Sequence, residues 1–340
     1  MPPKKLIPQI ASGKYGCVYK PPIHCQPSLC NVSINFERCN KGVSKLMSYE
    51  HAVDEYNEHS KIVSLIGDKY NLRTPLLCKP TLNSLSKYDE CKSIKDGDEK
   101  GLLIFDDAGK TFFNKLKEQM FSILKFKVGM LSLFEGVMYM SEHGIVHGDI
   151  KENNIMVDVD YNFKFIDFGI SWTDEPLGQA IVFWWPPEYY LLGTHVTKIK
   201  GGKLVYVTKH FKLSEWYKIM KTLITEPDPR LPDNIRIKLS HEEMKNLYEL
   251  IKSKVDVYSL GILLKHSKKS NNPYYNEFLN DPNMISLIDA MTDKDVTTRL
   301  SAKEAYEAYK IIIGRTTEDN IKRKRKSVDR CEASIFIINI

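Results

Sequence analysis

Long hydrophobic runs are absent from this sequence, since none approaches the roughly 20 apolar residues that a membrane-spanning helix needs. The first residues, Met1 to Lys5, contain no apolar segment of the length of a secretory signal. We therefore expect an intracellular, cytoplasmic protein that does not associate with membranes. A nuclear location stays open, because residues 322–326 form an unbroken basic run.

Cysteine is sparse and odd in number, with seven residues in the chain, so complete pairing within the chain is impossible. Cys25, Cys30 and Cys39 lie close together, with Cys17 nearby, but their spacing lacks the paired C-x-x-C knuckles of a zinc site. Because no export signal is visible, free thiols are the expected state.

Positive charge is only slightly in excess, since the formal net charge is +6. The basic run at residues 322–326 is typical of a solvated tail, with a nuclear-import or nucleic-acid-contacting tail as the alternative. We expect no nucleic acid to bind elsewhere. The 340 residues suffice for one large domain or two joined lobes.

Residues 1–106 predict a small sheet with one helix. Short β-prone runs bounded by turn residues indicate the strands, and Ile62, Leu65 and Ile66 share one face of the helix. Residues 23–41 form a polar, cysteine-bearing connection. The expected elements are strands over 7–10, 17–20, 43–47, 74–85 and 102–105 and a helix over 49–66.

Residues 107–314 predict a mainly helical region, followed by a basic tail over 315–340. Gly144 is expected to cap the long helix before it in a left-handed conformation. The expected elements are helices over 121–143, 215–225, 240–253, 255–265, 284–291 and 302–313, strands over 155–157 and 163–166, a hairpin over 198–205, and a strand over 334–340.

The most informative stretch is His147-Gly148-Asp149-Ile150-Lys151-Glu152-Asn153-Asn154, with Asp167-Phe168-Gly169 beyond a predicted hairpin. Two carboxylates on the two sides of a hairpin suit a divalent metal shared with a nucleotide. The pattern resembles the catalytic and metal-binding loops of protein kinases, H-R-D-x-K-x-x-N followed by D-F-G.

The resemblance assigns roles to the residues of these loops. Asp149 would accept the proton of the attacking hydroxyl, and Lys151 would steady the transferring phosphoryl group. Asn154 and Asp167 would hold Mg²⁺ against the phosphates of ATP.

Two further residues of the loop differ in what the resemblance implies. His147 would be structural, tying the loop to the turn at Asp167. Gly148 stands where the family usually has an arginine that docks a phosphorylated activation segment. Its presence implies that activity does not require that phosphorylation.

The N-terminal turn fits the same resemblance, because residues 11–18 match G-x-G-x-x-G-x-V except that Ala11 replaces the first glycine. Glycine lets backbone N–H groups approach phosphate oxygens. The missing glycine should stiffen the turn and lower nucleotide affinity, and an ordinary hairpin is the alternative. The expected nucleotide-binding residues here are Ile10, Ala11, Ser12, Gly13, Lys14, Tyr15, Gly16, Cys17 and Val18.

A phosphate-binding lysine is expected at Lys45, since Val43-Ser44-Lys45 on the third strand resembles V-A-I-K. Such a lysine is held by a glutamate from the next helix. Glu55 and Glu58 are the candidates, and Glu58 is preferred because it shares a face with Ile62 and Leu65.

Residues 102–109 resemble the linker between the lobes of a kinase. The backbone at Asp106 would hold the adenine, and Phe105 would guard the back of that pocket. 

Three later motifs also resemble kinase elements. Pro186-Pro187-Glu188 resembles A-P-E, and Asp256-Val257-Tyr258-Ser259-Leu260-Gly261 resembles the helix start that anchors the catalytic loop from below. Arg299 would pair with Glu188. The insert at about 189–255 is longer than the family usually has, and it would shape or block access of a protein substrate.

The resemblance extends from about Ile7 to Ile313 and implies an α+β, two-lobed protein-kinase-like fold. A small β-sheet lobe with one helix (1–106) would bind the nucleotide, and a larger, mainly helical lobe (107–314) would carry catalysis. Lys151, two residues after Asp149, is typical of serine/threonine kinases. The H-G-D variant and the cysteine-bearing connection resemble kinases encoded by large DNA viruses.

We therefore predict an ATP- and Mg²⁺-dependent serine/threonine kinase that acts on protein substrates. One alternative is a small-molecule phosphotransferase of the aminoglycoside or choline kinase type, which shares H-G-D-x-x-x-x-N but usually lacks the Pro-Pro-Glu closure. The other is a pseudokinase scaffold, which the retention of Lys45, Asp149, Asn154 and Asp167 disfavours. The sequence indicates no oligomeric state.

Overall fold

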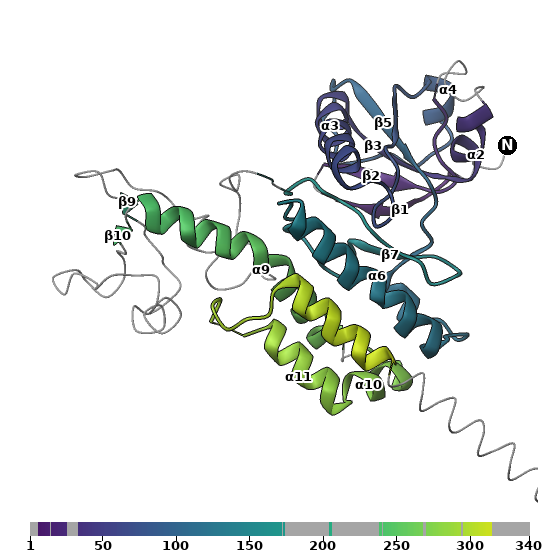
Figure 1. Cartoon of the computed structure of the whole chain (residues 1–340). Helices are drawn as coiled ribbons and strands as arrows, with labels where there is room; N and C mark the ends of the chain where they lie inside the picture. Colours follow the sequence, from purple (N-terminus) through teal and green to yellow (C-terminus); the bar gives the residue numbers. More distant parts are fainter. Residues whose placement is uncertain are drawn as a thin grey trace, which may run out of the picture. The chain divides into compact units, whose positions relative to one another are not determined.

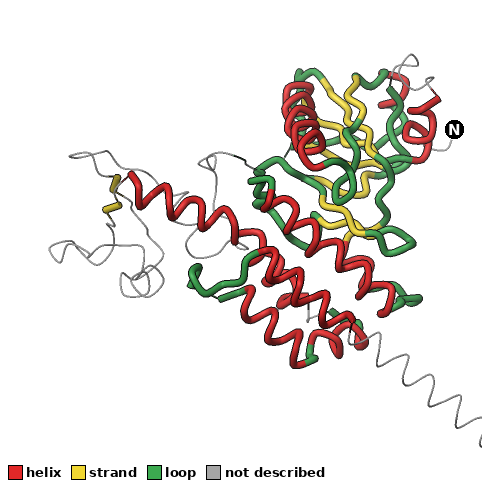
Figure 2. The backbone as a smooth tube through the Cα atoms, viewed as in Figure 1, coloured by secondary structure: helices red, strands yellow, loops and turns green. Residues whose placement is uncertain are grey.

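The computed structural model describes residues 6–13, 15–25, 33–171, 173, 204–205, 238–239, 241–267, 270–293 and 295–314. The chain divides into two compact units, the first formed by Met1–Phe112 with Asn153–Ser171 and the second by Phe113–Glu152 with Trp172–Ile340 (Figure 1). Strands dominate the first unit and helices the second (Figure 2), so the predicted α+β class is confirmed.

The first unit is built on a five-stranded antiparallel sheet with the order β1-β2-β3-β5-β4. The predicted strand over 74–85 was too long. The observed strand, β4, ends at Cys78. The Thr81 side chain then caps helix α4 by accepting a hydrogen bond from the Ser84 N–H. The strands are β1 Gln9–Ser12, β2 Gly16–Tyr19, β3 Val43–Ser48, β4 Leu76–Cys78 and β5 Lys100–Phe105, and α4 is Leu82–Leu85.

Helix α3, Tyr49–Ile66, has the bounds that the sequence predicted, and it covers one face of this sheet. Ser48 caps its start by accepting a hydrogen bond from the His51 N–H, and Gly67 ends it at a φ of 69°. Ala52 on this helix packs against Met47 of β3 and Leu103 of β5. These contacts lie on the face of the sheet that also carries Lys45, because alternate residues of a strand share a face.

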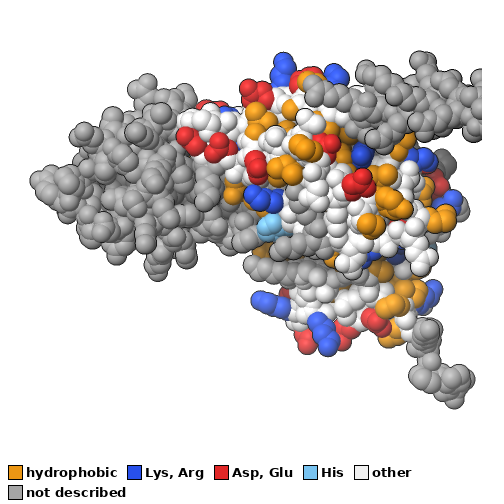
Figure 3. Space-filling view, turned by 90° about the horizontal axis from the view of Figure 1, so that it is seen from below, with side chains coloured by type: hydrophobic (Ala, Val, Ile, Leu, Met, Phe, Trp, Pro, Cys, Tyr) orange, Lys and Arg blue, Asp and Glu red, His pale blue; other side chains and the backbone are white. Residues whose placement is uncertain are grey.

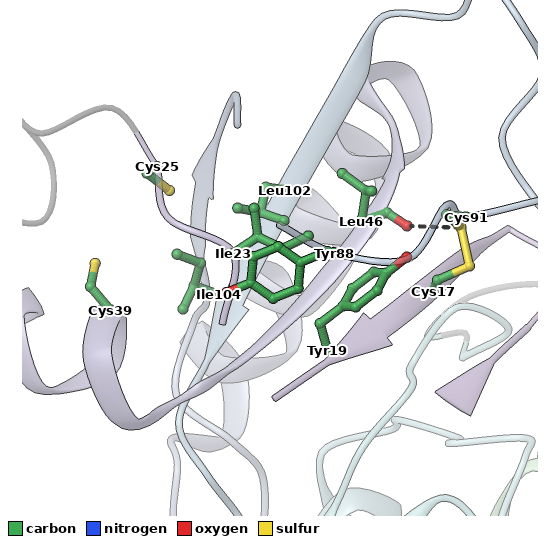
Figure 4. Close-up of a cluster of buried hydrophobic side chains, with 10 residues drawn as sticks. All are labelled: Cys17, Tyr19, Ile23, Cys25, Cys39, Leu46, Tyr88, Cys91, Leu102 and Ile104. Carbon is green, nitrogen blue, oxygen red and sulfur yellow. Dashed lines mark hydrogen bonds between the residues drawn. A yellow bond between two sulfur atoms is a disulfide. The ribbon is translucent and has the colours of Figure 1, made fainter. Parts of the chain in front are cut away.

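The opposite face of the sheet carries two disulfides, of which Figure 4 draws the one between Cys17 and Cys91, so the prediction of free thiols was wrong. Cys17 pairs with Cys91 and Cys25 with Cys78, at sequence separations of 74 and 53, and Cys39 is also disulfide-bonded. Local spacing could not reveal pairs that only the folded sheet brings together. Around them lie the buried side chains of Tyr19, Ile23, Leu46, Tyr88, Leu102 and Ile104.

The polar connection between β2 and β3 contains a helix that the sequence did not predict, α2, Ser33–Lys41. Gly42 follows it, and a side chain at this position would collide with the carbonyl oxygens of Phe105 and Arg38. Glycine therefore allows the end of α2 to lie directly against the end of β5.

A three-stranded sheet completes the first unit, with β6 Lys110–Thr111, β7 Ile155–Val157 and β8 Phe163–Phe165 in that order. The β7–β8 turn is held by Asp158, whose carboxylate accepts hydrogen bonds from the N–H groups of Asp160 and Asn162. The Phe165 N–H donates to the Tyr70 carbonyl oxygen at 2.8 Å. Residues 153–171, assigned to the second lobe from the sequence, therefore group with the first unit.

The second unit has a helical core in which Phe134 stacks on Tyr309 with ring centroids 4.2 Å apart. Gly144 has the predicted left-handed conformation, with a φ of 66°. The two helices predicted over 240–253 and 255–265 form one helix, α9, because no residue between them interrupts it. The helices are α5 Phe112–Leu116, α6 Ile123–Glu142, α9 His241–Ser267, α10 Pro273–Leu279, α11 Pro282–Met291 and a last one over 302–314.

Part of the predicted insert is visible as a strand pair, in which β9 Leu204–Val205 pairs antiparallel with β10 Lys238–Leu239. The remainder of the predicted 198–205 hairpin, the helix over 215–225 and the tail over 315–340 lie outside the described residues. Within the described part of the chain, no helix has the length and apolar character needed to cross a membrane. On the face shown in Figure 3, acidic, basic and hydrophobic side chains of the described residues are interspersed.

Candidate active site

A tight turn joins β1 to β2, and its use for phosphate binding stays a prediction. The Gly13 N–H donates to the Gly16 carbonyl oxygen at 2.9 Å. A side chain at Gly16 would collide with the Leu46 carbonyl oxygen of β3, so glycine is required for the turn to lie on the sheet. Ile10 and Tyr15 are exposed, and Lys14 lies outside the described residues.

Ala11, Val18 and Lys45 lie opposite one another on β1, β2 and β3, so their side chains emerge on one face of the sheet. Ser12 pairs with Cys17, which belongs to the other face. Because the Cys17 side chain is buried in its disulfide, only the backbone of Cys17 remains for the predicted nucleotide contact.

Lys45 forms its ion pair with Glu55, whose Oε2 lies 2.5 Å from the lysine Nζ. The preference for Glu58 was therefore wrong. Both partners are largely buried, at 22% and 19% side-chain exposure. Burial raises the pKa of Glu55, although the charge and hydrogen bond of Lys45 act in the opposite direction.

The error in choosing the glutamate came from the wrong helix face. Leu65, which supported Glu58, is exposed at 45%. The buried face of α3 is formed by Ala52, His59, Ile62 and Ile66. Glu55 lies three residues after Ala52 and four before His59, so it belongs to this face.

Burial also raises the pKa of Glu58, and the nearby charges of Asp54, Glu55 and Asp167 raise it further. The charges that act on Glu58 are therefore of its own sign.

The predicted metal ligands lie at the two ends of the β7–β8 hairpin. Asn154 is buried immediately before β7, and Asp167 is exposed two residues after β8 with a φ of 65°. The Ile166 N–H donates to the Asn154 carbonyl oxygen at 3.0 Å, so the hairpin brings the two positions together. Amide and carboxylate oxygens are ligands that Mg²⁺ accepts.

The described residues contain no cluster of three or more His, Cys, Asp and Glu side chains that could hold a metal alone. Mg²⁺ bound with a nucleotide takes only one or two protein carboxylates, with the phosphates supplying other ligands. Asn154 and Asp167 therefore fit a metal shared with a nucleotide.

His59 is a neighbour of this hairpin that the sequence reasoning missed. Its ring lies edge-on to Phe168 and Phe105, at centroid distances of 5.7 and 5.8 Å. Its Nε2 donates to the Leu72 carbonyl oxygen at 2.9 Å, and burial lowers its pKa. Its position four residues after Glu55 was the signal that could have identified it.

The predicted catalytic loop lies in the second unit and is ordered by internal contacts. Lys151 Nζ is 2.5 Å from Asp149 Oδ2. The Asp149 N–H donates to His147 Nδ1 at 3.3 Å, so this histidine supports the aspartate within its own loop. The expected link from His147 to the turn at Asp167 stays a prediction.

Asp256 on α9 holds the backbone of the loop, as the sequence predicted. Its two carboxylate oxygens accept hydrogen bonds from the N–H groups of His147 and Gly148, at 2.7 and 3.0 Å. Burial raises the pKa of Asp256 from its ordinary 3.8 to about 6, against the lowering effect of these two bonds. Gly148 has a φ of 75°, a conformation that favours glycine at this position.

The predicted partner of Arg299, Glu188, lies outside the described residues. Arg299 is buried, its Nε donates to the Asp293 carbonyl oxygen at 2.9 Å, and its guanidinium lies 4.7 Å from the ring centre of Tyr258. These contacts place it against the helix that carries Asp256.

Comparison with known proteins gives matches over about half of the chain. Residues 5–189 match the model of the protein kinase domain family. Cyclin-dependent kinase C-2 of Arabidopsis thaliana is 24% identical over 211 residues, covering 55% of this chain and 36% of that protein. Mitogen-activated protein kinase 14 of Xenopus laevis is 24% identical over 190 residues, covering 51% and 47%.

A shorter match is closer in sequence. Mitogen-activated protein kinase kinase kinase mkh1 of Cytospora mali is 44% identical over 61 residues, covering 16% of this chain and 3% of that protein. The chain thus spans less than half the length of the curated relatives it matches.

Proposed function

This chain belongs to the protein kinase domain family, and on that premise we propose that it transfers the γ-phosphoryl group of ATP to serine or threonine hydroxyls of protein substrates. The observation that carries the proposal is the Lys45–Glu55 ion pair on the face of the sheet that also presents Ala11 and Val18. A lysine held in this way is a fixed positive charge suited to phosphate oxygens.

The residues present fit the two implied cofactors. Lys45 supplies the positive charge for the phosphates of ATP, and the β1–β2 turn supplies backbone N–H groups. The oxygens of Asn154 and Asp167 suit Mg²⁺. When bound, Mg²⁺ would neutralise the charge that develops on the phosphates.

The proposed roles of the chain in the reaction follow from the loop geometry. The Asp149 carboxylate would take the proton of the attacking hydroxyl. Lys151, which already contacts Asp149, would place its positive charge beside the transferring group. Asp256 would keep the loop in position through its two backbone hydrogen bonds.

The choice of serine or threonine is supported by Lys151, which tyrosine kinases usually lack at this position. A second feature of the loop bears on how the enzyme is activated. Gly148, with its positive φ, stands where the family usually has an arginine that docks a phosphorylated activation segment. We therefore propose that the enzyme is active without phosphorylation of its activation segment.

The test is transfer of labelled phosphate from ATP to generic protein acceptors, followed by hydrolysis of the product. We expect phosphoserine and phosphothreonine, and we expect chelation of Mg²⁺ by EDTA to abolish the transfer. Dominant phosphotyrosine would refute the proposed specificity. Transfer to small alcohols alone would identify a small-molecule phosphotransferase, and no transfer with intact nucleotide binding would identify a pseudokinase.

A further inference from the structure

The segment after β5 presents a carboxylate that two arginines enclose. Arg38 donates from Nε and Nη2 to the two oxygens of Asp106, both at 3.1 Å. Arg73 donates from Nε and Nη2 to the same two oxygens, at 2.9 and 2.8 Å. Two bidentate pairs on one carboxylate fix its orientation as well as its charge.

Arg38 reaches this carboxylate from the helix that the sequence did not predict. The guanidinium is buried at 9% exposure, and its Nη1 also donates to the Thr74 carbonyl oxygen at 2.8 Å. Gly42 allows the end of α2 to lie against the end of β5, and Cys39 of α2 is buried in the same cluster as Leu102 and Ile104 of β5. Helix α2 thus places one buried cation, Arg38, against the segment that follows β5.

The rest of the segment is also restrained. Lys20, just after β2, places Nζ 2.6 Å from Asp107 Oδ2. The other oxygen of Asp107 accepts a hydrogen bond from the Gly109 N–H at 3.1 Å. Gly109 has a φ of 87°, and a side chain there would collide with the Val157 carbonyl oxygen of β7. Side chains from several segments of the first unit therefore fix residues 106–109.

We propose that Arg38 and Arg73 are positioning residues for nucleotide binding, acting through Asp106 to hold the linker backbone in the conformation that receives the adenine. The inference rests on the proposed function, because the linker backbone is the part that would contact the base. A backbone fixed before binding loses less freedom when the ligand arrives, and this increases affinity. Burial raises the pKa of Asp106, but the hydrogen bonds and charges of Arg73 and Arg38 lower it by more, so the carboxylate stays ionised at neutral pH.

The test begins with Arg73→Gln, because Arg73 is 56% exposed and its replacement should leave the fold intact. We expect the KM for ATP and the Kd for ADP to rise about three- to ten-fold, with kcat changed less than about two-fold. Arg73→Lys should recover only part of the affinity, since an ammonium cannot form the bidentate pair. Lys41→Gln is the matched control, because Lys41 is an exposed cation on α2 that forms its ion pair with Glu37 of the same helix.

A double-mutant cycle tests whether the arginine acts through Asp106. Asp106→Asn alone should weaken ADP binding, and adding Arg73→Gln to it should cause no further loss. Arg38→Gln should likewise cause no further loss of ADP affinity when it is added to Asp106→Asn. Thermal unfolding of each variant would detect one that fails to fold.

The outcomes separate the inference from the proposed function. Equal ADP affinity of the native chain and Arg73→Gln, or fully additive losses in the cycle, would overturn the inference alone. A native chain that binds no adenine nucleotide would overturn both. A fall in kcat without a rise in KM for ATP would show that Arg73 does not position the nucleotide, and would also overturn the inference.

Discussion

The Lys45–Glu55 ion pair is the single contact on which the proposed phosphate binding most depends. Its two charges are 2.5 Å apart and largely removed from water. Removing one partner of such a pair leaves the other buried without compensation. Without Glu55, the Lys45 ammonium group would lose the partner that orients it.

We predict that Glu55→Gln lowers kcat/KM about 100-fold, because a lysine displaced by about 1 Å no longer stabilises the transferring phosphoryl group. Glu58→Gln is the matched control on the same helix and should stay within about three-fold of the native value, since Lys45 pairs with Glu55 and the charges acting on Glu58 are those of Asp54, Glu55 and Asp167. Steady-state kinetics with a protein acceptor provides the measurement. A larger loss in Glu58→Gln would show that the ion pair is not the functional one.

Asp256 gives a prediction about pH. Its pKa of about 6 in the folded protein lies above its ordinary 3.8, so the folded state binds the proton more tightly than the unfolded state. Its contribution to stability is therefore complete below pH 3.8 and is lost as the pH rises through about 6. The loss amounts to roughly 3 kcal/mol.

The measurement is the free energy of unfolding of the native chain and of Asp256→Asn between pH 4 and 7. Asparagine does not titrate, so the difference between the two curves should change over this interval. Parallel curves would contradict the raised pKa.

At the scale of the elements, the two faces of the first sheet serve different purposes. The face with α3 carries Lys45, whereas the opposite face carries the disulfides Cys17–Cys91 and Cys25–Cys78. Cys17 directly follows the β1–β2 turn, and Cys78 ends β4. The covalent links thus stabilise the strands that support the proposed nucleotide site.

We predict that reduction lowers the stability of the first unit by about 2–4 kcal/mol for each disulfide, since the links restrict the unfolded chain. Thermal unfolding with and without a phosphine reductant measures the effect. The double variant Cys25→Ser/Cys78→Ser should be less stable before reduction and should respond less to it. Free thiols at all four positions in the folded protein, found by mass spectrometry after alkylation, would contradict the structure.

Some elements could be predicted from local sequence and others could not. The bounds of α3 follow from the cap at Ser48 and the glycine at Gly67, which are local signals. Helix α2 lies in a polar segment, and its place depends on contacts with β5. The disulfides likewise join residues that only tertiary structure makes neighbours.

Some residues of the candidate site could likewise be predicted from local sequence, and others could not. Asp149, Lys151, Asn154 and Asp167 could be proposed from the sequence because they lie at the spacing of the kinase motifs along one loop and one hairpin. The partner of Lys45 required the correct helix face, which the exposed Leu65 obscured. Arg38 and Arg73 carry no sequence signal at all, since they meet Asp106 only through the packing of separate segments.

For the whole molecule, the chain contains two units that each carry part of the proposed machinery. The first holds Lys45, Asn154 and Asp167, and the second holds Asp149 and Lys151. Residues 149–154 connect the two sets through one continuous loop. The central claim is that these residues together perform phosphoryl transfer with Asp149 as the base.

The most direct measurement compares incorporation of labelled phosphate into a protein acceptor by the native chain and by Asp149→Asn. Loss of the general base should lower kcat by roughly 10²- to 10⁴-fold, while ADP affinity and thermal unfolding stay close to native. Asp160→Asn, which removes an exposed carboxylate from the β7–β8 turn, should transfer phosphate at the native rate. Equal incorporation by the native chain and Asp149→Asn would contradict the claim.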